Sequence, residues 1–329
     1  MKILLTGATG GLGYRTLENL IKNQDVKSII ASGRTIKPSH FVKHPKIDYQ
    51  LGNLEDFDFV RKLVKQVDCI VHAAALSSPW GKYNEFKKAN LDTQINLIKA
   101  AKEVKIKRFI YISTPSIYYN AKANLNVKET EEITDGFINA YAKTKYEAEI
   151  ELQKSKIPYV ILRPRALIGR GDNVIMPRLI RAFDDGKLKI IGNGKNIVDL
   201  TSLENVADAI ELSLTVEGNG LNQTYNITNG EVIDLWKSIE KVLSLLGRKL
   251  SKQKVPYFIV KLLAQILELK SKMTDFKEPA LTVYSIRTIA KSFTLDISKA
   301  EKLLGYKPKV SIEEAIIEFV NWYEKLENK

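Results

Sequence analysis

A glycine-rich turn near the start of the chain constrains the fold more than any other feature. Residues 2–6 form an apolar run typical of a strand, and apolar residues at helical spacing follow the turn. Gly7 would allow a tight turn, Gly10 would let a pyrophosphate approach the backbone, and Gly13 would let the helix pack against the strand. The start of that helix offers free N–H groups to phosphates. We therefore predict a dinucleotide site whose contacts include the turn residues Gly7, Thr9, Gly10, Gly11, Leu12 and Gly13.

The residue after the second predicted strand indicates which dinucleotide is bound. Residues 28–31 form that strand, which ends in Ser32-Gly33-Arg34 without an aspartate or glutamate. An acidic residue at this place binds the ribose hydroxyls of NAD, whereas an arginine accommodates the 2′-phosphate of NADP. We expect NADP(H) to be favoured, with NAD(H) as the second choice. The alternative is that Arg34 is simply a surface residue.

Strands and helices alternate through the first half of the chain. Strand patterns cover 2–6, 28–31, 47–50, 69–72, 108–112 and 159–162, and helical patterns cover 56–67, 84–104 and 140–153. Such alternation is typical of a parallel sheet that is covered by helices on both faces. We predict an α/β fold, a Rossmann-type doubly wound parallel sheet, with ligands at the carboxyl ends of its strands.

Beyond residue 165 the alternation loosens. Helical patterns cover 174–183, 204–214 and 235–246, short strands are expected at 187–191 and 197–200, and capping boxes are expected at Ser298/Glu301 and Ser311/Glu314. We assign residues 1–165, with a returning contribution from about 196–230, to a NAD(P)-binding domain. Residues 166–329 are assigned mainly to a smaller, mostly helical region that binds the substrate.

Four tyrosines have a lysine four positions further along: Tyr83/Lys87, Tyr118/Lys122, Tyr141/Lys145 and Tyr257/Lys261. On a helix this spacing places the phenol and the ammonium on one face, and a nearby cation favours the phenolate. Only Tyr141 begins a predicted helix that follows the strand ending in Ser113-Thr114 and precedes another strand. We expect this helix to bring Tyr141 to the Thr114 hydroxyl above the cofactor, where the phenol serves acid–base chemistry.

Charge and cysteine content speak against several classes of protein. The formal charge is +13, but the basic residues are spread along the chain and alternate with acids, so nucleic acid is not expected as a partner. The single cysteine, Cys69, excludes an internal disulfide, and three scattered histidines predict no metal site. With no signal-peptide pattern and no apolar run of membrane-spanning length, we expect a cytoplasmic location.

Residues 256–269 carry an apolar stripe at helical spacing: Ile259, Leu262, Leu263, Ile266 and Leu267. Such a stripe usually packs into a core, and this is our expectation here. Three other interpretations stay open: peripheral contact with a membrane, a gate for the substrate and a dimer surface. The segment is too short to span a bilayer.

Several motifs recur in order along the chain: the glycine turn at 6–13, His72-Ala73-Ala74-Ala75, Ile112-Ser113-Thr114, Tyr141-Ala142-Lys143-Thr144-Lys145, Arg163-Pro164-Arg165 and Gly169-Arg170-Gly171-Asp172. As a set they resemble the extended short-chain dehydrogenase/reductases, the NAD-dependent epimerase/dehydratase family. Within it the chain most resembles the 3β-hydroxysteroid dehydrogenase-like branch, through Ser77-Ser78-Pro79-Trp80-Gly81, residues 113–118, Asp199-Leu200-Thr201, and residues 296–300 and 304–308. The resemblance extends essentially from end to end.

The resemblance implies a role for each matching residue. Tyr141 would be the acid/base, Lys145 would hold the nicotinamide ribose and support the phenolate, and Thr114 would hydrogen-bond the same substrate oxygen. Further cofactor contacts would come from Arg34, Asn53, Leu54, Ala73, Ala74, Ala75, Asn90, Ser113 and Pro164. Substrate contacts would come from Ser78, Trp80, Ser116 and Arg170. Two of these residues depart from the family pattern: Asn53 stands in place of a frequent aspartate that reads adenine, and Arg170 in place of a frequent proline.

The activity implied by the resemblance is reversible hydride transfer between NADP(H) and a secondary alcohol or ketone. The substrate would be hydrophobic, either steroid-like or a long-chain β-hydroxy or β-keto compound, and a homodimer is common in the family. A nucleotide-sugar epimerase with tightly bound NAD is the alternative, because it uses the same tyrosine and lysine. Dehydration is disfavoured, because Pro115-Ser116 follow Thr114 where the dehydratases have Asp-Glu. A regulatory protein without turnover is a third class.

Overall fold

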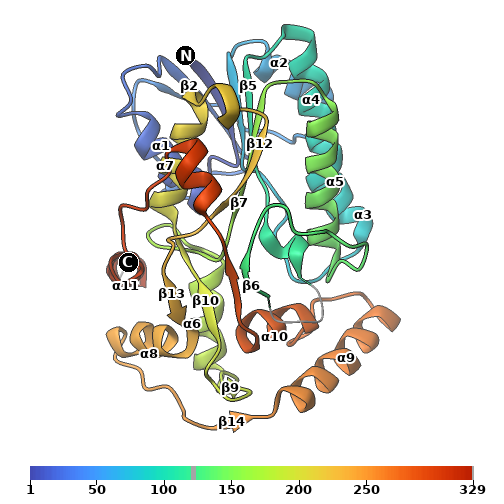
Figure 1. Ribbon diagram of the computed structural model, residues 1–329, viewed down its shortest axis with the longest axis vertical. Helices are drawn as coiled ribbons and strands as arrows, with labels where there is room; N and C mark the ends of the chain where they lie inside the picture. Colours follow the sequence, from blue (N-terminus) through green and yellow to red (C-terminus); the bar gives the residue numbers. More distant parts are fainter. Residues whose placement is uncertain (120–123, 328–329) are drawn as a thin grey trace.

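The computed structural model describes residues 1–119 and 124–327, and at its centre lies a parallel sheet of seven strands (Figure 1). The strands are β1 (Lys2–Thr6), β2 (Ser28–Ser32), β3 (Ile47–Tyr49), β4 (Cys69–His72), β5 (Arg108–Ile112), β7 (Tyr159–Pro164) and β12 (Gln223–Ile227). They lie in the order β12-β7-β5-β4-β1-β2-β3, and every neighbouring pair is parallel. The strand order therefore reverses beside β1, where open α/β sheets bind their ligands.

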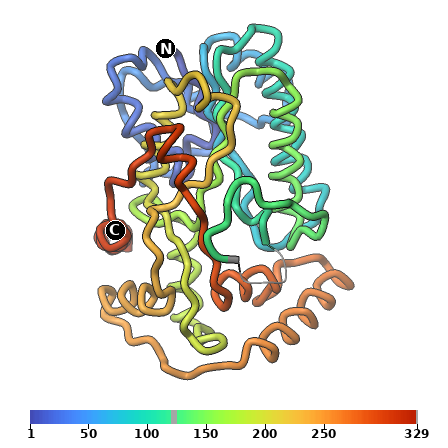
Figure 2. Tube along the Cα trace, viewed as in Figure 1, coloured from blue at the N-terminus to red at the C-terminus, as the bar shows by residue number. Residues whose placement is uncertain are grey.

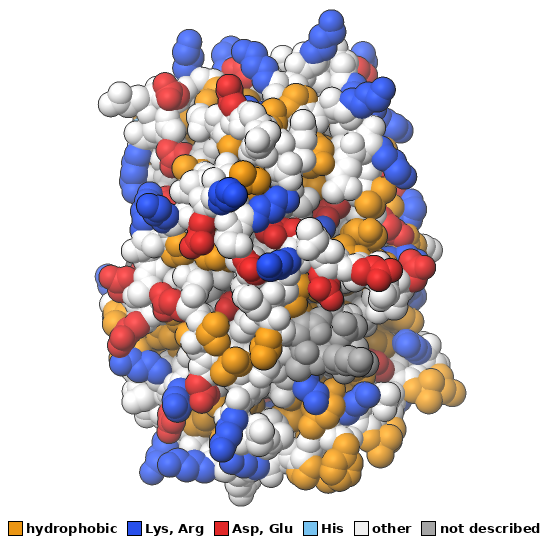
Figure 3. All heavy atoms as spheres, viewed as in Figure 1, with side chains coloured by type: hydrophobic (Ala, Val, Ile, Leu, Met, Phe, Trp, Pro, Cys, Tyr) orange, Lys and Arg blue, Asp and Glu red, His pale blue; other side chains and the backbone are white. Residues whose placement is uncertain are grey.

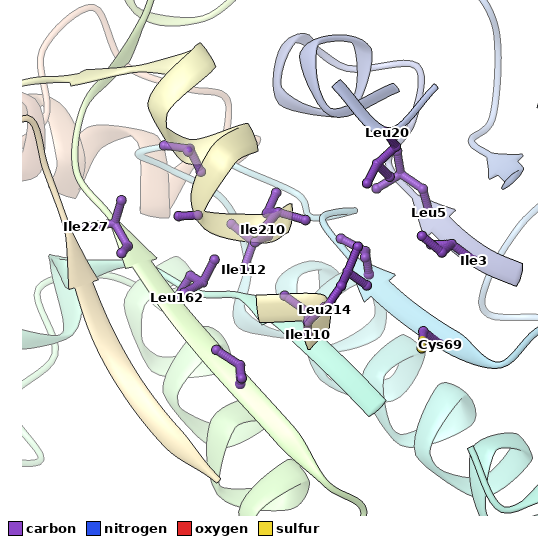
Figure 4. Packing of buried hydrophobic residues seen from close by; sticks show 14 of the residues in the cluster. Ile3, Leu5, Leu20, Cys69, Ile110, Ile112, Leu162, Ile210, Leu214 and Ile227 are labelled. Carbon is purple, nitrogen blue, oxygen red and sulfur yellow. The ribbon is translucent and has the colours of Figure 1, made fainter. Parts of the chain in front are cut away.

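Helices bury both faces of this sheet. On one face lie α1 (Gly11–Leu20) and α7 (Leu203–Thr215), and on the other lie α2 (Phe57–Val64), α4 (Thr93–Val104) and α5 (Ala140–Lys154). Ile3 and Leu5 enter the core beside α1 and α7 (Figure 4), whereas Leu4 enters the opposite core. Successive side chains of a strand point to opposite faces, so a strand that is apolar throughout needs cover on both. The predicted Rossmann-type fold is confirmed.

The other elements form a smaller region, the lower half of Figure 1. Its four-stranded sheet has the order β13-β10-β15-β6, with β6 (Asn124–Val127), β10 (Ile197–Asp199), β13 (Val232–Asp234) and β15 (Phe293–Leu295). Its helices are α6 (Ile175–Asp184), α8 (Leu235–Leu245), α9 (Tyr257–Met273), α10 (Val283–Ala290) and α11 (Ile312–Glu327). We call this region the cap, and the seven-stranded sheet with its five helices the sheet unit. The division of the chain near residue 165 stays our proposal.

Two pairs of very short strands complete the cap. They join β8 (Leu167–Ile168) to β11 (Thr201–Ser202) and β9 (Ile190–Ile191) to β14 (Lys254–Val255). Figure 2 shows the long connection that leaves α8, passes through β14 and reaches α9 along the lower edge of the molecule. Short 3-10 turns occur at η1 (Pro38–His40), η3 (Pro115–Tyr118) and η4 (Gly218–Gly220), and a π turn at η5 (Ala300–Leu304).

The helix predicted over 84–104 forms in three parts. α3 (Tyr83–Phe86) leads into a π-helical segment, η2 (Lys87–Asp92), which then continues as α4. A π-helical segment inside a longer helix is frequent at functional sites, because it shifts the direction in which the following side chains project. Asn90 lies inside this segment.

One of the two predicted capping boxes is wrong. The backbone nitrogen of Glu301 already donates to the Ile297 oxygen at 3.0 Å, so it is not available to the Ser298 hydroxyl. Asp296 caps this turn instead, because its Oδ1 accepts from the Ser298 nitrogen at 2.7 Å. The second box forms as predicted, with Ser311 Oγ accepting from the Glu314 nitrogen at 3.2 Å.

The apolar stripe of residues 256–269 does not pack into a core, so that prediction is wrong. α9 buries Val260 and Ala264 against the rest of the cap, whereas Leu262 and Ile266 are 59% and 56% exposed. The smaller residues of the helix face inward and the larger ones outward. Helical spacing defines a stripe, but it does not define the side on which a partner lies.

Candidate active site

The β1–α1 turn is packed too closely to hold side chains. Gly7 has a φ of +71°, and a Cβ at this residue would lie 2.6 Å from the backbone nitrogen of Ala74. A Cβ on Gly13 would lie 2.1 Å from the Gly7 oxygen, so α1 approaches the strand only because this residue is glycine. Gly10 precedes α1 and offers no side-chain cap, which leaves the first N–H groups of the helix to a ligand. These features fit a pyrophosphate group.

The end of β2 lies beside this turn. Thr9 packs over Gly33, where a Cβ would meet the Thr9 hydroxyl at 2.4 Å. Arg34 follows directly and is exposed. Of the remaining turn residues, Leu12 is half-buried, and Gly11 is covered by the Gly171 oxygen, which would lie 2.3 Å from a Cβ there. The structure therefore places Arg34 at the edge of the predicted dinucleotide site.

The ends of β3 and β4 supply the next predicted cofactor contacts. Asn53 is exposed, and Leu54 is buried with its oxygen accepting from Asn96 Nδ2 at 3.1 Å. Ala73 and Ala74 are half-buried and Ala75 is exposed beyond the last residue of β4. Small side chains at these three positions leave the strand end accessible to a flat ligand.

Asn90 fastens the loop after β4 to α5. Its Oδ1 accepts from the Leu76 nitrogen at 2.8 Å, and its Nδ2 donates to the Leu76 oxygen and to Thr144 Oγ1, both at 3.2 Å. The side chain is buried, and its amide is occupied by these three bonds. In this geometry Asn90 acts as a positioning residue for the loop that precedes Ser77.

Tyr141 stands in the first turn of α5. Asn139 caps this helix by accepting from the Ala142 nitrogen at 2.9 Å, which fixes the direction in which the phenol projects. Burial raises the pKa of Tyr141, and the nearby side chains of Thr114 and Ser77 oppose the rise. Thr114 therefore lies close to the phenol, as expected.

A chain of hydroxyl groups continues from Thr114 into the cap. Thr114 Oγ1 donates to Ser116 Oγ at 3.1 Å, and Ser116 Oγ lies 3.0 Å from the hydroxyl of Tyr284. Tyr284 belongs to α10, and burial raises its pKa well above that of an ordinary tyrosine. A second phenol that keeps its proton therefore faces Tyr141 across the site.

Lys145 lies one turn after Tyr141 on α5 and is only 2% exposed. Its Nζ donates to the Ile112 oxygen at 2.5 Å and lies 4.1 Å from the ring centroid of Tyr111. Burial lowers the pKa of Lys145 to about 7, although the charge of Glu149 opposes this shift. Among the described residues no group hydrogen-bonds the buried hydroxyl of Ser113, so that hydroxyl is available to a ligand.

Pro164 ends β7 between two buried arginines. Arg163 Nε donates to Glu149 Oε1 at 3.0 Å, and this ion pair connects β7 to α5. Arg165 Nη1 donates to the hydroxyl of Tyr119 at 3.1 Å. These contacts fix the strand end where the nicotinamide contact was predicted.

A cavity of about 170 Å³ opens between the start of α5 and the cap. It is lined by Pro79, Trp80, Gly81, Phe86, Ile138, Asn139, Ala140, Glu268, Lys272, Phe276 and Tyr284. The ring of Phe86 is 6.4 Å from that of Tyr141, so the cavity lies beside the phenol. Its wall combines aromatic and aliphatic side chains with the polar groups of Asn139, Glu268, Lys272 and Tyr284.

The loop before α3 forms one wall of this cavity. Trp80 stacks on Phe276 with ring centroids 5.3 Å apart, and its Nε1 donates to Ser271 Oγ at 3.0 Å. Ser78 is nearby, but its hydroxyl donates to the Trp80 oxygen at 2.8 Å and thereby shapes the loop. Of the predicted substrate contacts, Trp80 reaches the cavity and Ser116 reaches Tyr284.

Arg170 lies elsewhere, which corrects its predicted substrate contact. Its guanidinium donates to Tyr14, to Glu18 Oε1 at 2.9 Å and to Glu318 Oε1 at 3.2 Å. These partners belong to α1 and α11, so Arg170 ties the loop after β8 to both helices. The carboxylates of Glu18 and Glu318 pair with the Arg170 guanidinium. The prediction missed them because they lie far from Arg170 in the sequence.

Two residues of the site had no assigned role in the sequence. Ser77 was part of a recognised motif, and the loop after β4 could have suggested a partner for Tyr141. Tyr284 had no local signal, because it reaches the site from a distant helix. The other tyrosine–lysine pairs lie apart: Tyr83 donates to Glu147 Oε2 at 2.9 Å, Tyr257 begins α9, and Lys122 lies outside the described residues.

Comparisons with known proteins agree with this geometry. The protein is 30% identical to YbjS of Escherichia coli (98% of this chain, 97% of the relative) and 29% identical to a 2-alkyl-3-oxoalkanoate reductase of Stenotrophomonas maltophilia (96% and 97%). It is 27% identical to a decarboxylating sterol-4-alpha-carboxylate 3-dehydrogenase of Candida albicans (97% of both chains). The predicted likeness to hydroxysteroid dehydrogenases is thereby confirmed.

A solved structure, the UDP-glucuronic acid 4-epimerase of Bacillus cereus with NAD, has the same fold, with a TM-score of 0.76 over 99% of both chains at 24% identity. The family model described as "NAD dependent epimerase/dehydratase family" matches residues 3–228, a span that includes the glycine turn, Thr114, Tyr141 and Lys145. The chain belongs to the NAD-dependent epimerase/dehydratase family.

Proposed function

We propose that the protein is a NAD(P)-dependent dehydrogenase/reductase that interconverts a secondary alcohol and a ketone on a hydrophobic substrate. One observation carries the proposal: the Tyr141 phenol lies close to Thr114 and beside a cavity whose lining includes Trp80, Phe86, Ile138 and Phe276. Relatives named as a 2-alkyl-3-oxoalkanoate reductase and a sterol-4-alpha-carboxylate 3-dehydrogenase support the same substrate class.

The bound nicotinamide would supply the hydride to the carbonyl carbon, or accept it in the reverse direction. Tyr141 transfers its proton to the substrate oxygen as the carbonyl becomes an alcohol, and the phenolate later regains a proton from solvent. When substrate binds, the Thr114 hydroxyl would turn its one proton from Ser116 Oγ to the same oxygen and so orient the carbonyl. The ammonium of Lys145, one turn along α5, stabilises the phenolate.

Two side chains set the environment of this proton transfer. Ser77 lies close to the Tyr141 hydroxyl and lowers its pKa, and Tyr284 is hydrogen-bonded to Ser116, which in turn accepts from Thr114. Apolar groups such as Phe86 keep water away from one side of the phenol and increase the strength of each remaining polar contact.

We further propose that NADP(H) is favoured over NAD(H). Arg34 is exposed beyond β2, beside the glycine turn, and no acidic residue follows the strand in Ser32-Gly33-Arg34. A 2′-phosphate would gain a charge-assisted hydrogen bond there, whereas the free ribose hydroxyls would lack the carboxylate that usually binds them.

Epimerisation of a nucleotide sugar is the alternative activity. It uses the same tyrosine and lysine, and an epimerase shares the fold. The apolar lining from Trp80, Phe86, Ile138 and Phe276 favours the reductase, because a sugar nucleotide presents hydroxyls and phosphates to its site.

The activity is tested by Tyr141→Phe, with Tyr83→Phe as the matched control. Consumption of NADPH would be followed with 3-oxosteroids and 2-alkyl-3-oxo acids, and UDP-sugars would be supplied separately without added cofactor. We expect Tyr141→Phe to lower kcat by at least about 100-fold while cofactor binding is unchanged. Undiminished turnover by Tyr141→Phe would refute the role of the phenol. Conversion of UDP-sugars without net NADPH use would establish the epimerase.

The cofactor preference is tested by Arg34→Gln, with the exposed Arg178→Gln of the cap as control. Titration should show NADPH binding at least about tenfold weaker in Arg34→Gln, and NADH binding within about twofold of the parent protein. If NADPH binding does not change, Arg34 is a surface residue without a role in cofactor choice.

A further inference from the structure

The outward side of α9 is the largest gathering of exposed apolar side chains among the described residues. Of sixteen large hydrophobic residues that are exposed, seven lie on this one helix. We call them the α9 apolar face: Phe258, Ile259, Leu262, Leu263, Ile266, Leu269 and Met273. Figure 3 shows hydrophobic side chains gathered at the lower right, where α9 lies in Figure 1. Exposed apolar residues are normally scattered, so a continuous patch of this kind indicates an interaction surface.

An ordinary surface helix turns its large apolar side chains towards the core, whereas α9 turns them towards solvent. Leu262, Ile266, Leu269 and Met273 follow the spacing i, i+4, i+7, i+11 and form a single outward stripe. Their exposed fractions reach 60% at Leu269 and 78% at Met273. The inward side is already satisfied, because Glu268 Oε1 accepts from the Val283 nitrogen at 2.8 Å and Val260 is buried against the cap. The described part of the chain leaves the α9 apolar face uncovered, so a partner for this face would come from another molecule.

Lysines outnumber acidic residues in and around α9. Residues 252–278 contain six lysines and three acidic residues. Lys254 is exposed just before the helix and Lys270 in its last turn, whereas Lys272 lies over the Trp80 ring and lines the cavity. Of the acids, Glu268 is occupied by the Val283 nitrogen, Glu278 lies near Arg178, with a closest N–O distance of 3.7 Å, and Asp275 is exposed. The apolar face therefore has a basic rim.

We propose that α9 docks this protein onto the surface of a bilayer that contains anionic lipids. A helix with an apolar face and lysines at its rim lies in the plane of the interface, with its apolar side chains among the acyl chains and its lysines at the headgroups. Across residues 1–119 and 124–327, no helix is long and apolar enough to cross a membrane, so α9 rests on the surface.

A second copy of the chain fits the same face less well. Pairing through α9 would bring two basic rims together, and like charges repel. An anionic surface instead attracts the basic rim of the single chain.

Docking through α9 would also place the substrate cavity at the membrane. Lys272 in the last turn of α9 and Phe276 just after the helix line the cavity, and Ser271 accepts from the Trp80 indole in its wall. A hydrophobic ketone dissolved in the bilayer would then reach Tyr141 from the lipid side. This last step rests on the proposed function, whereas the docking itself does not.

The docking is tested by sedimentation of the full chain with vesicles, in the absence of substrate and cofactor. Vesicles of phosphatidylcholine mixed with phosphatidylglycerol should pellet the protein, and the bound fraction should fall when salt is added. The triple variant Leu262→Gln/Ile266→Gln/Leu269→Gln should bind at least about tenfold more weakly. If the parent protein stays in the supernatant, or the triple variant binds equally well, the proposal fails.

Matched controls separate the apolar face from general hydrophobicity and charge. A triple variant at exposed apolar residues elsewhere, Leu125→Gln/Val232→Gln/Ile317→Gln, should bind vesicles like the parent protein. Lys254→Gln and Lys270→Gln should each weaken binding about fivefold, and only to vesicles with phosphatidylglycerol. Equal losses in the control triple would show that the α9 face is not the contact.

Two further measurements keep the outcome clear if a variant folds poorly. In Phe258→Trp, the emission of the new tryptophan should shift to shorter wavelength when vesicles are added, because the side chain enters the acyl region. Analytical ultracentrifugation would detect the competing explanation, and a dimer that the triple variant dissociates, without vesicle binding, would overturn the proposal. Turnover of a short, water-soluble ketone should persist in the triple variant, so loss of docking and loss of the proposed activity are distinguishable.

Discussion

The sheet unit and the cap bury their apolar side chains in different ways. In the sheet unit, each apolar strand lies between two helical layers, and α7 returns from the second half of the chain to complete one of them. In the cap, strands of two to four residues are joined to helices around small cores, and α9 buries only one side. The comparison shows that apolar residues form a core only where a second surface of the protein packs against them.

Removal of one charge from an ion pair should destabilise the two regions most unequally. In the sheet unit, Glu149 and Arg163 are both buried, and Glu149→Gln would leave a buried guanidinium without its carboxylate. We expect the free energy of unfolding to fall by about 3–5 kcal/mol. In the cap, Asp185 and Lys187 form an exposed pair, and Asp185→Asn should change it by less than about 1 kcal/mol. Urea unfolding measures both, and equal effects would remove the distinction.

The second-largest difference in stability is expected when a leucine in each region is shortened to alanine. Leu162 in β7 is fully buried, and Leu162→Ala should lower the free energy of unfolding by about 3 kcal/mol through the cavity it leaves. Leu262 on α9 is 59% exposed, and Leu262→Ala should change it by no more than about 0.5 kcal/mol. Thermal and urea unfolding report both values. A large loss in Leu262→Ala would mean that α9 packs inward in solution.

Glycine substitution has an effect that depends on the backbone around it. A Cβ at Gly13 would meet the Gly7 oxygen at 2.1 Å, so Gly13→Ala should displace the turn and weaken cofactor binding by at least about 100-fold. Gly247 in the cap has a positive φ, +69°, which Gly13 does not, but nothing lies within 4 Å of a Cβ there. Gly247→Ala should cost about 1 kcal/mol of stability and leave cofactor binding unchanged. Cofactor titration distinguishes the two.

Acid sensitivity should arise in the sheet unit, because all three histidines lie within the first 72 residues. Burial, together with the charge of Lys145, lowers the pKa of His72 to about 3. As the pH falls below about 6.5, the His72 imidazole is protonated in the unfolded chain but stays neutral in the folded protein. The folded state therefore loses stability towards pH 3. We expect a loss of about 2 kcal/mol between pH 7 and pH 5.

His72→Asn should flatten this pH dependence, because the variant has no imidazole to protonate at that position. The remaining slope would include His40, whose pKa is also lowered by burial, and Asp199, whose pKa burial raises to about 6 and which acts in the opposite direction. The check is urea unfolding at a series of pH values. The same slope in parent and variant would show that His72 does not control acid stability.

Local patterns predicted the parts of the site that depend on backbone constraints. The glycine turn, the strand ends at Ser113-Thr114 and the helix start at Tyr141 each follow from short-range geometry, and the structure places them at one edge of the sheet. Tyr284 and the partners of Arg170 could not be predicted in this way. They come together only because α10 and α11 fold back on residues far earlier in the chain.

The sequence by itself determined the family, the alternation of strands and helices, and the choice of Tyr141 among four tyrosine–lysine pairs. These features depend on backbone sterics and on periodicity, and neighbouring residues are enough to set both. Only the tertiary structure decided which side of α9 is buried, which acids neutralise Arg170 and which phenol faces Tyr141. Those outcomes depend on which surfaces meet, and a single stretch of chain does not contain its partner.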